Sequence, residues 1–373
     1  MQDVIVIGGC HHNMLGVLRS LGQKGINSYV IIETNEETPY VLKSKYIKFS
    51  WKVRTENEVL DILRKYVYLF PSKPVVIACS DNLSSLLDQN KDELSKHYFI
   101  PGAEKQGVIT CLMNKEEMIK LAADSGFLIP QSTATDTNSS ERVNISMPWI
   151  VKPLVSKDGA KSDIERIYSY TDWENYKKKH GVKVQVQQLI DKEFEYQLIG
   201  LSLYGGSEVI IPGVSHVIRP AATTNTGFLH YEPLNKSFES VVKAGKDFLK
   251  ATTYSGLFSL EFLRGKDGKD YFMEINFRND GNAICVTAAG VNLPYIWYLY
   301  NVSGNYRSEI ENRIIKPVYI MPEFSDLSYM IHGKLGFFTW IKDIIRTDSY
   351  MEFDFHDQKP FWTLFFQRLF KRV

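Results

Sequence analysis

The chain has 373 residues, of which 44% are hydrophobic and 23% charged, and its net charge is +1 at pH 7. This composition predicts a globular protein of two or three domains and gives no global signal for nucleic-acid binding. The four cysteines form no CxxC motif or Cys/His cluster, which argues against structural zinc and a disulfide framework. No signal peptide is visible, and no apolar run approaches the roughly 20 residues that span a bilayer. We therefore expect a cytoplasmic protein.

The first hundred residues predict a parallel α/β unit. Residues 4–7 and 26–32 read as buried strands, and the apolar spacing between them predicts a helix. A third strand is expected at 75–79, followed by a helix for which Ser80 is a good N-cap. The glycine-containing loop at 8–13 lacks the G-x-G-x-x-G spacing of a dinucleotide site. A nucleotide-dependent oxidoreductase using this loop therefore stays only as an alternative function.

The next segment predicts a helix, a polar connector and two strands. The helix begins at Asn114-Lys115, and the connector covers residues 131–146. Strands are expected at 149–153 and 182–190, and the residues after the second one, 191–195, read as a bend. Lys152 lies in a run so apolar that its amine must reach an anion or extend to water.

The following residues predict strands at 209–212 and 215–219 and an amphipathic helix at 238–249. Arg219 closes an apolar run before a small-residue loop, where a forked cation suits a phosphate or carboxylate, or else forms a surface ion pair. Residues 295–300 read as a core helix. The last predicted helix, 361–373, is aromatic and basic and has no acidic residue.

A hairpin is predicted around Asp267-Gly268, a strong two-residue turn signal. If those residues form the turn, Glu261 falls opposite Glu274 and Ser259 opposite Asn276. Alternation then places five residues on the core face: Phe258, Leu260, Phe262, Met273 and Ile275. Facing carboxylates repel unless a cation lies between them, and a hard divalent cation with an added carbonyl oxygen from Asn276 would suit them. The alternative is a solvated sheet face with two unrelated glutamates.

Glu261, followed thirteen residues later by Glu274-Ile275-Asn276-Phe277-Arg278, resembles the metal-binding core of the ATP-grasp superfamily. Members of that superfamily join a carboxylate to an amine through an acyl-phosphate made from ATP. The resemblance implies an α/β and α+β protein with an N-terminal Rossmann-like domain (1–110) and a two-lobed ATP-grasp fold. The small lobe would cover 111–190, the large catalytic lobe 191–330, and an aromatic, basic extension 331–373.

The resemblance also implies a nucleotide site. The segment 114–130 is similar to a family segment in which Lys115 is the first nucleotide lysine, although Asn114 replaces the usual aspartate. Lys152 matches the second lysine, and the loop 155–162 matches the flap over the phosphates, although it has only one glycine where the family has two or three. The implied ATP-binding residues are Lys115, Lys152, Ser156, Gly159, Gln187, Gln188, Leu189, Ile190, Glu193 and Glu195. For the ribose-binding acid we prefer Glu195 and keep Glu193 as the second choice.

The remaining site residues follow from the same resemblance. The implied metal ligands are Glu261, Glu274 and Asn276, and the implied catalytic residues are Arg219, Arg278 and Asn276. Within the superfamily, the chain resembles the carboxylate–amine ligase branch, which includes D-aspartate ligase-like and capsule- or cell-wall-associated ligases. The N-terminal domain of that branch helps to hold the acceptor, so the expected substrate contacts are His11, His12, Asp81, Asp280 and Asn282. For the N-terminal three, simple loop and capping roles are the alternative.

These residues predict an ATP-dependent ligase that forms an amide, with ATP and Mg²⁺ (or Mn²⁺) as cofactors. The partners expected are small carboxylate and amine substrates, with an amino acid joined to a glycan or peptide as the favoured class. Nucleic acid is not expected, a homodimer is left open, and a non-catalytic ATP-binding scaffold is the other alternative. The helix 361–373 could lie on an anionic membrane, where it would contact a glycan complex at its inner face, or dock onto the protein body or a partner subunit.

Overall fold

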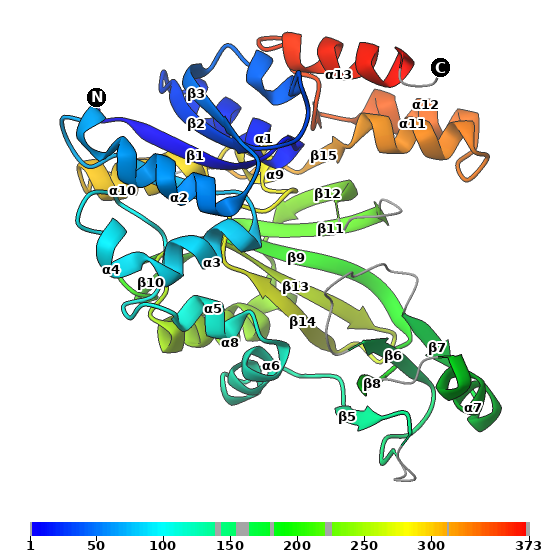
Figure 1. The fold of residues 1–373 in the computed structure, drawn as a ribbon. Coiled ribbons are helices and arrows are strands. Elements are labelled where there is room, and N and C mark those ends of the chain that lie inside the picture. The colour runs from blue at the N-terminus through cyan, green and yellow to red at the C-terminus, as the bar shows by residue number, and fades with distance from the viewer. Residues whose placement is uncertain are drawn as a thin grey trace.

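The computed structural model describes residues 2–138, 143–153, 164–179, 183–220, 226–311 and 313–370. In these ranges the chain forms a parallel N-terminal sheet, a large and mostly antiparallel central sheet, and a small antiparallel sheet (Figure 1). The fold is thus mixed α/β. No helix in the described ranges is long and apolar enough to cross a membrane.

The N-terminal sheet has the order β3-β2-β1-β4, and all its neighbours are parallel. Its strands are β1 (Val4–Gly9), β2 (Ser28–Glu33), β3 (Ile47–Val53) and β4 (Val75–Ala78), and its helices are α1 (His12–Gly22), α2 (Glu56–Lys65), α3 (Asp81–Gln89) and α4 (Lys91–Leu94), with 3₁₀ turns at Tyr40–Lys43 and Val67–Leu69. The predicted strand–helix–strand order is confirmed, and so is the N-cap, since Ser80 Oγ accepts from the Leu83 amide. Both faces of the sheet are buried, as the apolar strands require.

The small sheet has the order β5-β8-β6-β7. This part of the chain contains α5 (Val108–Leu112), α6 (Lys115–Asp124), β5 (Ser132–Asp136), β6 (Trp149–Pro153), β7 (Glu165–Ile167), α7 (Tyr170–Lys179) and β8 (Lys183–Gln188). The helix start is confirmed, because Asn114 caps α6 by accepting from the Glu116 amide. The prediction of a polar connector over 131–146 was wrong in its first part. Residues of β5 pair with β8 there, since an edge strand with one solvated face can be built from polar residues.

The central sheet has the order β14-β13-β9-β11-β12-β15-β16, with β10 paired to β9. Its strands are β9 (Lys192–Leu203), β10 (Glu208–Ile210), β11 (Gly213–Pro220), β12 (Gly227–Pro233), β13 (Gly256–Gly265), β14 (Asp270–Asn276), β15 (Val318–Met321) and β16 (Ser349–Tyr350). The helices that follow its strands are α8 (Glu239–Thr252), α9 (Ile284–Ala288), α10 (Leu293–Val302), α11 (Glu323–Ile331), α12 (Phe337–Arg346) and α13 (Lys359–Phe370), with 3₁₀ turns at Lys236–Phe238 and Arg307–Glu309. The bend expected at 191–195 is shorter than predicted, because β9 already begins at Lys192.

Two cores hold these sheets together. The first core joins the N-terminal sheet and α1 to α9, α10 and residues 199–203 of β9. The second core packs α5, α6 and α8 against β9, β13 and β14. We call the N-terminal sheet with α1 to α4 the N-terminal unit. The strand β9 contributes to both cores, so it fixes this unit relative to the hairpin β13–β14.

The C-terminal segment is tied to the N-terminal unit through Arg19 of α1, whose side chain is only 3% exposed. Its guanidinium donates to the carbonyl oxygens of Met351 (3.3 Å), Glu352 (2.8 Å) and Asp357 (3.0 Å), and Nε lies 3.3 Å from Asp357 Oδ2. The same carboxylate accepts from Ser44 Oγ at 2.8 Å. In Figure 1, α13 accordingly lies beside the N-terminal unit, away from the small sheet.

Candidate active site

The hairpin β13–β14 brings Glu261 opposite Glu274 and Ser259 opposite Asn276, as predicted. The route to this register differs from the two-residue turn. Arg264 pairs with Asp270, so five residues separate the two members of this pair and the register is shifted by one position. A bulge at Met273 of β14, opposite Glu261 and Phe262 of β13, then shifts it back.

The bulge changes the place of one side chain. Met273 was predicted on the core face, and that was wrong: it is the extra residue of the bulge and lines a cleft between the small sheet and the hairpin. Phe272 takes the core position instead and stacks on Phe127 with ring centroids 4.8 Å apart. The other four predicted core residues are buried: Phe258, Leu260, Phe262 and Ile275.

The cleft has a volume of about 370 Å³. It is lined by Lys115, Met118, Ile119, Ile150, Lys152, Ile164, Gln185, Gln187, Glu195, Tyr196, Gln197, Val217, Glu261, Phe262, Leu263, Met273 and Glu274. Apolar side chains thus surround two lysines, three glutamates and three glutamines. Apolar walls around a few convergent polar groups are typical of a small-molecule site.

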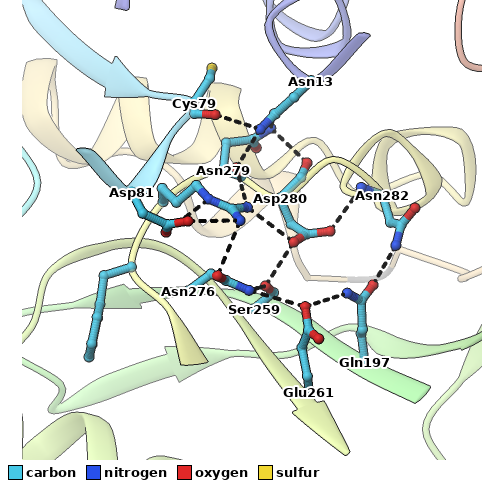
Figure 2. Close-up of polar contacts among 12 residues, drawn as sticks. Asn13, Cys79, Asp81, Gln197, Ser259, Glu261, Asn276, Asn279, Asp280 and Asn282 are labelled. Carbon is cyan, nitrogen blue, oxygen red and sulfur yellow. Dashed lines mark hydrogen bonds and ion pairs between the residues drawn. The ribbon is translucent and has the colours of Figure 1, made fainter. Parts of the chain in front are cut away.

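Glu261 is held by amide donors. Gln197 Nε2 donates to Glu261 Oε1 at 3.0 Å, and Asn276 Nδ2 donates to the same oxygen at 3.1 Å (Figure 2). Burial, and after it the neighbouring charges of Glu274 and Asp280, raises the pKa of Glu261 to about 8. The carboxylate is therefore unstable as an isolated anion in this position and would be stabilised by a cation.

Glu274 has no hydrogen bond or ion pair within the described ranges. Burial raises its pKa, while Lys115, Arg278 and Lys152 act to lower it. The ammonium of Lys152 donates to Gln187 Oε1 at 3.0 Å, and burial lowers the pKa of Lys152. The cleft therefore contains two cationic side chains, Lys115 and Lys152, together with the carboxylate pair.

A polar network links the hairpin to the N-terminal unit (Figure 2). Arg278 Nε lies 3.1 Å from Asp81 Oδ1, Nη1 lies 3.2 Å from Asp280 Oδ2, and Nη2 donates to Asn276 Oδ1 at 3.1 Å. Asp280 also accepts from Ser259 Oγ at 3.0 Å. The first residue of α3 and the end of β14 are therefore held in a fixed relation by one arginine.

The network continues through Asn282, whose Nδ2 donates to Gln197 Oε1 at 2.7 Å and whose amide donates to Asp280 Oδ1 at 2.8 Å. The five residues Asp81, Gln197, Asn276, Asp280 and Asn282 thus form one connected cluster around Arg278 and Glu261. Three of the expected substrate contacts lie in this cluster.

The two histidines lie at the start of α1. His11 is the N-cap residue, and its Nδ1 accepts from the Asn13 amide at 3.3 Å. The His12 ring lies 3.8 Å from the His11 ring, centroid to centroid, and its Nδ1 is 3.9 Å from Glu352 Oε1. Burial lowers the pKa of both imidazoles, and Arg278 adds to the effect at His11. Their contact with substrate stays a prediction.

The residues after β8 have a structural role in this conformation. The amide of Gln188 donates to Gln131 O at 2.8 Å, and the amide of Leu189 donates to Pro148 O at 2.9 Å, while Ile190 lies against Gly265. On β9, Glu195 lines the cleft, where it is paired with Lys192 at 2.7 Å. Glu193 is exposed and does not line it. Ser156, Gly159 and the rest of the loop 155–162 lie outside the described residues.

Arg219 is engaged elsewhere. Its guanidinium bonds to Asp326 of α11 and lies 2.9 Å from Asp343 Oδ2 of α12, and it stacks over the Phe228 ring at 5.0 Å. It does not line the cleft, and two buried carboxylates already neutralise it in this conformation. The role of Arg219 at a phosphate stays a prediction.

The carboxylate pair fits a magnesium ion in part. In the described ranges no three His, Cys, Asp or Glu side chains form a metal cluster, so the candidate ligands are two carboxylates and one amide. Magnesium in nucleotide sites is commonly held by one or two carboxylates together with phosphates, which suits Glu261 and Glu274. Asn276 fits less directly, because its amide nitrogen faces Glu261 and its oxygen faces Arg278.

Two residues of the site were missed at the sequence level, Gln185 and Gln197. Both follow from strand alternation. Gln185 lies two residues before Gln187 on β8, and Gln197 lies two residues after Glu195 on β9, so each shares a face with an expected site residue. Applying the period of two to those strands would have found both.

Comparison with solved structures identifies the fold. An L-amino acid ligase from Bacillus licheniformis is 17% identical, with a TM-score of 0.62 over 85% of this chain and 78% of that one. The N5-carboxyaminoimidazole synthetase from Staphylococcus aureus in complex with ADP is 13% identical, with a TM-score of 0.64 over 85% and 81%. The biotin carboxylase domain of the Hydrogenobacter thermophilus 2-oxoglutarate carboxylase, a dimer in complex with MgADP, is 15% identical, with a TM-score of 0.62 over 86% and 74%. No protein-family model and no curated protein sequence matches the chain.

The protein therefore has the ATP-grasp fold that its hairpin motif indicated. At these identities the likeness concerns the fold, and the chemistry has to be argued from the cleft.

Proposed function

We propose that this protein is an ATP-dependent carboxylate–amine ligase that forms an amide through an acyl-phosphate. The observation that carries the proposal is the pair Glu261 and Glu274, which face each other across the hairpin inside a cleft that also contains Lys115 and Lys152. Carboxylates for a hard cation and ammonium groups for phosphate oxygens are the two parts that phosphoryl transfer requires.

In the proposed complex ATP occupies the cleft. The adenine lies between the apolar side chains of the small sheet and the hairpin, close to Gln187 and the backbone of residues 188–190. Glu195 accepts from the ribose hydroxyls, because it lines the cleft and Glu193 does not. Lys115 and Lys152 bind phosphate oxygens. When bound, Mg²⁺ would be held by Glu261 and Glu274, with Asn276 after rotation of its amide, and would neutralise charge on the phosphates.

The reaction has two steps. A carboxylate oxygen of the first substrate attacks the γ-phosphorus, the bond from that phosphorus to the bridging oxygen breaks, and ADP leaves. An amine then attacks the acyl carbon, forms the C–N bond, loses a proton, and expels phosphate. The chain's own residues act by placing the reactants and by stabilising charge, with Arg278 next to the carboxylate pair as the cation for the acyl-phosphate.

The acceptor side would lie where the N-terminal unit meets the hairpin. Asp81, Asp280 and Asn282 surround Arg278 there, and His11 and His12 begin the adjacent helix. We propose the N-terminal unit as a Rossmann-like domain that helps to hold the acceptor. We also propose that the chain has four parts, with boundaries after residues 110, 190 and 330. The favoured substrates are an amino acid and a glycan or peptide carboxylate, and a homodimer is part of the proposal.

The oxidoreductase alternative is not favoured. The side chain of Asn13 bonds to the carbonyl oxygens of Cys79 and Asn279 at 2.9 and 2.8 Å, so the loop at the start of α1 is tied to the neighbouring segments. The described cleft lies at the hairpin instead.

An ADP-release screen tests the proposal. Amino acids are paired with candidate carboxylates in the presence of Mg²⁺ and ATP, and Glu274→Gln is run alongside the wild-type protein. ADP formation that needs both substrates and disappears in the variant is the expected result. ATP binding without turnover on any pair would instead favour the non-catalytic scaffold.

A further inference from the structure

The last helix, α13, is apolar on both of its faces. On its inner face Leu364 packs against the main core, and Gln367 Nε2 donates to Thr38 O at 2.6 Å. The sequence hypothesis that this helix docks onto the protein body therefore describes one face only. A helix that is hydrophobic all round is normally buried on all sides.

The outer face of α13 has no cover within the described residues. Trp362 is 45% exposed, Phe366 48%, Leu369 54% and Phe370 69%, and these four share one face because their spacing is i, i+4, i+7 and i+8. Their rings are continuous: Trp362 and Phe366 have centroids 6.2 Å apart, and Phe366 and Phe370 6.3 Å.

A second helix, α12, lies at the same end of the molecule as α13 (Figure 1). On α12, Phe338 is 86% exposed and Ile345 is 79% exposed, and they lie seven residues apart on one face. We call the six exposed side chains of the two helices the C-terminal apolar surface: Phe338, Ile345, Trp362, Phe366, Leu369 and Phe370.

The acidic and basic side chains of residues 326–370 differ in their exposure. Four acids of the C-terminal segment are buried within the protein, namely Asp326, Asp343, Glu352 and Asp357. The lysines of the same segment, Lys334, Lys342 and Lys359, are all exposed, and so is Arg368. Of the other two acids in residues 326–370, Asp348 is exposed and Asp354 is half-buried. The solvent side is therefore apolar and cationic.

We propose that the C-terminal apolar surface binds an anionic lipid membrane. Exposed aromatic and aliphatic side chains in a part of the chain whose lysines are exposed and whose acids are mostly buried match the interface of a negatively charged bilayer, where rings enter the headgroup region and cations meet phosphates. An exposed apolar area of this kind marks an interaction site. The cleft is lined by residues of the small sheet and the hairpin β13–β14. Figure 1 shows the small sheet away from α13, so contact of α13 with a membrane leaves that side of the protein in solution.

Vesicle flotation tests this proposal independently of any ligase activity. Full-length protein is mixed with phosphatidylcholine vesicles that contain or lack phosphatidylglycerol. We expect flotation with the anionic vesicles, a loss of binding at high salt, and a reduction of about tenfold or more in the Phe366→Glu/Leu369→Glu variant, which places charge on the inserting face. Both residues point outward, so the variant keeps its melting temperature.

Tyr68→Glu is the matched control, because Tyr68 is 92% exposed on the N-terminal unit, and it should float like the wild-type protein. Equal flotation of wild-type protein and the double variant, or no flotation at all, would overturn the proposal. Light scattering supplies one more outcome: a dimer that the double variant abolishes, without vesicle binding, would assign the surface to a second copy of the chain and also overturn it.

Discussion

Replacing Glu274 by glutamine removes one of two facing carboxylates while keeping the size of the side chain. The register pairs Glu274 directly with Glu261, whose pKa is raised to about 8 by burial and by this neighbour. At a pH above that pKa, where Glu261 is ionised, relief of the like-charge cross-strand pair should increase the metal-free stability by about 0.2–1 kcal/mol. Glu274 has no hydrogen bond in the described ranges that the change would break.

The same variant should lose the response to Mg²⁺. Loss of an outer-shell partner of a metal ligand typically costs 10–100-fold, so loss of a direct ligand should reduce ADP formation by at least about 100-fold, or about 2.7 kcal/mol in the activation barrier. Steady-state ADP release measures this loss, and thermal melts with ATP in the presence and absence of Mg²⁺ give a second measurement that needs no acceptor.

Glu104→Gln is the matched control, because Glu104 is exposed in a loop and does not line the cleft, and it should behave like the wild-type protein. The reasoning is refuted if Glu274→Gln turns over ATP at the wild-type rate, or if its stability changes while its Mg²⁺ response stays intact. Either result would make the two glutamates an ordinary acidic sheet face.

Three further predictions follow from the same structure. Glu195→Ala should weaken ATP binding by about 1.5–3 kcal/mol through loss of a charge-assisted hydrogen bond, measured by calorimetry. Burial raises the pKa of Glu261 in the folded protein from 4.5 to about 8. Its contribution to stability is therefore full below the unfolded pKa and is lost as the pH rises through the folded pKa, so the metal-free melting temperature should fall between about pH 5 and pH 8. Mg²⁺·ATP should raise the melting temperature most at the alkaline end of this range. Asp357→Ala should destabilise the protein by about 3–5 kcal/mol, measured by denaturant unfolding, because it leaves the buried cation of Arg19 without its carboxylate.

Each of these has its own control. Glu193→Ala should leave ATP affinity unchanged, and a stronger effect there than at Glu195 would exchange their roles. The pH trend should flatten in Glu261→Gln, and a slope that persists belongs to other groups. Asp3→Asn breaks the exposed pair with Lys48 and should cost no more than about 1 kcal/mol, so a comparable loss at Asp357 would mean that Arg19 does not depend on its partner.

The register of the hairpin was predictable because two constraints agree. The Asp-Gly signal located the turn. The apolar residues of both strands had to share the buried face, which requires Glu261 to pair with Glu274, and the bulge restores this pairing after the longer connection. The bulge itself has no local signature, so the move of Met273 from the core to the cleft could not be predicted from alternation.

The position of Arg219 shows the opposite case. Its sequence neighbourhood indicated a cation for a phosphate or carboxylate, or else a surface ion pair. Its partners Asp326 and Asp343 lie more than a hundred residues further along the chain. Tertiary pairing at such a distance cannot be derived from one sequence without a contact model. The strand β5 was missed for a related reason, since its partner β8 supplies the pairing that its polar residues do not suggest.

The bond network of Arg19 has a consequence for how the protein is made. Arg19 and Asp357 are 338 positions apart, so the arginine leaves the ribosome long before its carboxylate partner. Domains generally fold in the order of their synthesis, but here the N-terminal unit would bury a cation that has no partner until Asp357 has been made. The nascent N-terminal unit should therefore keep α1 loosely packed and remain open to chaperones until residues 351–357 have emerged.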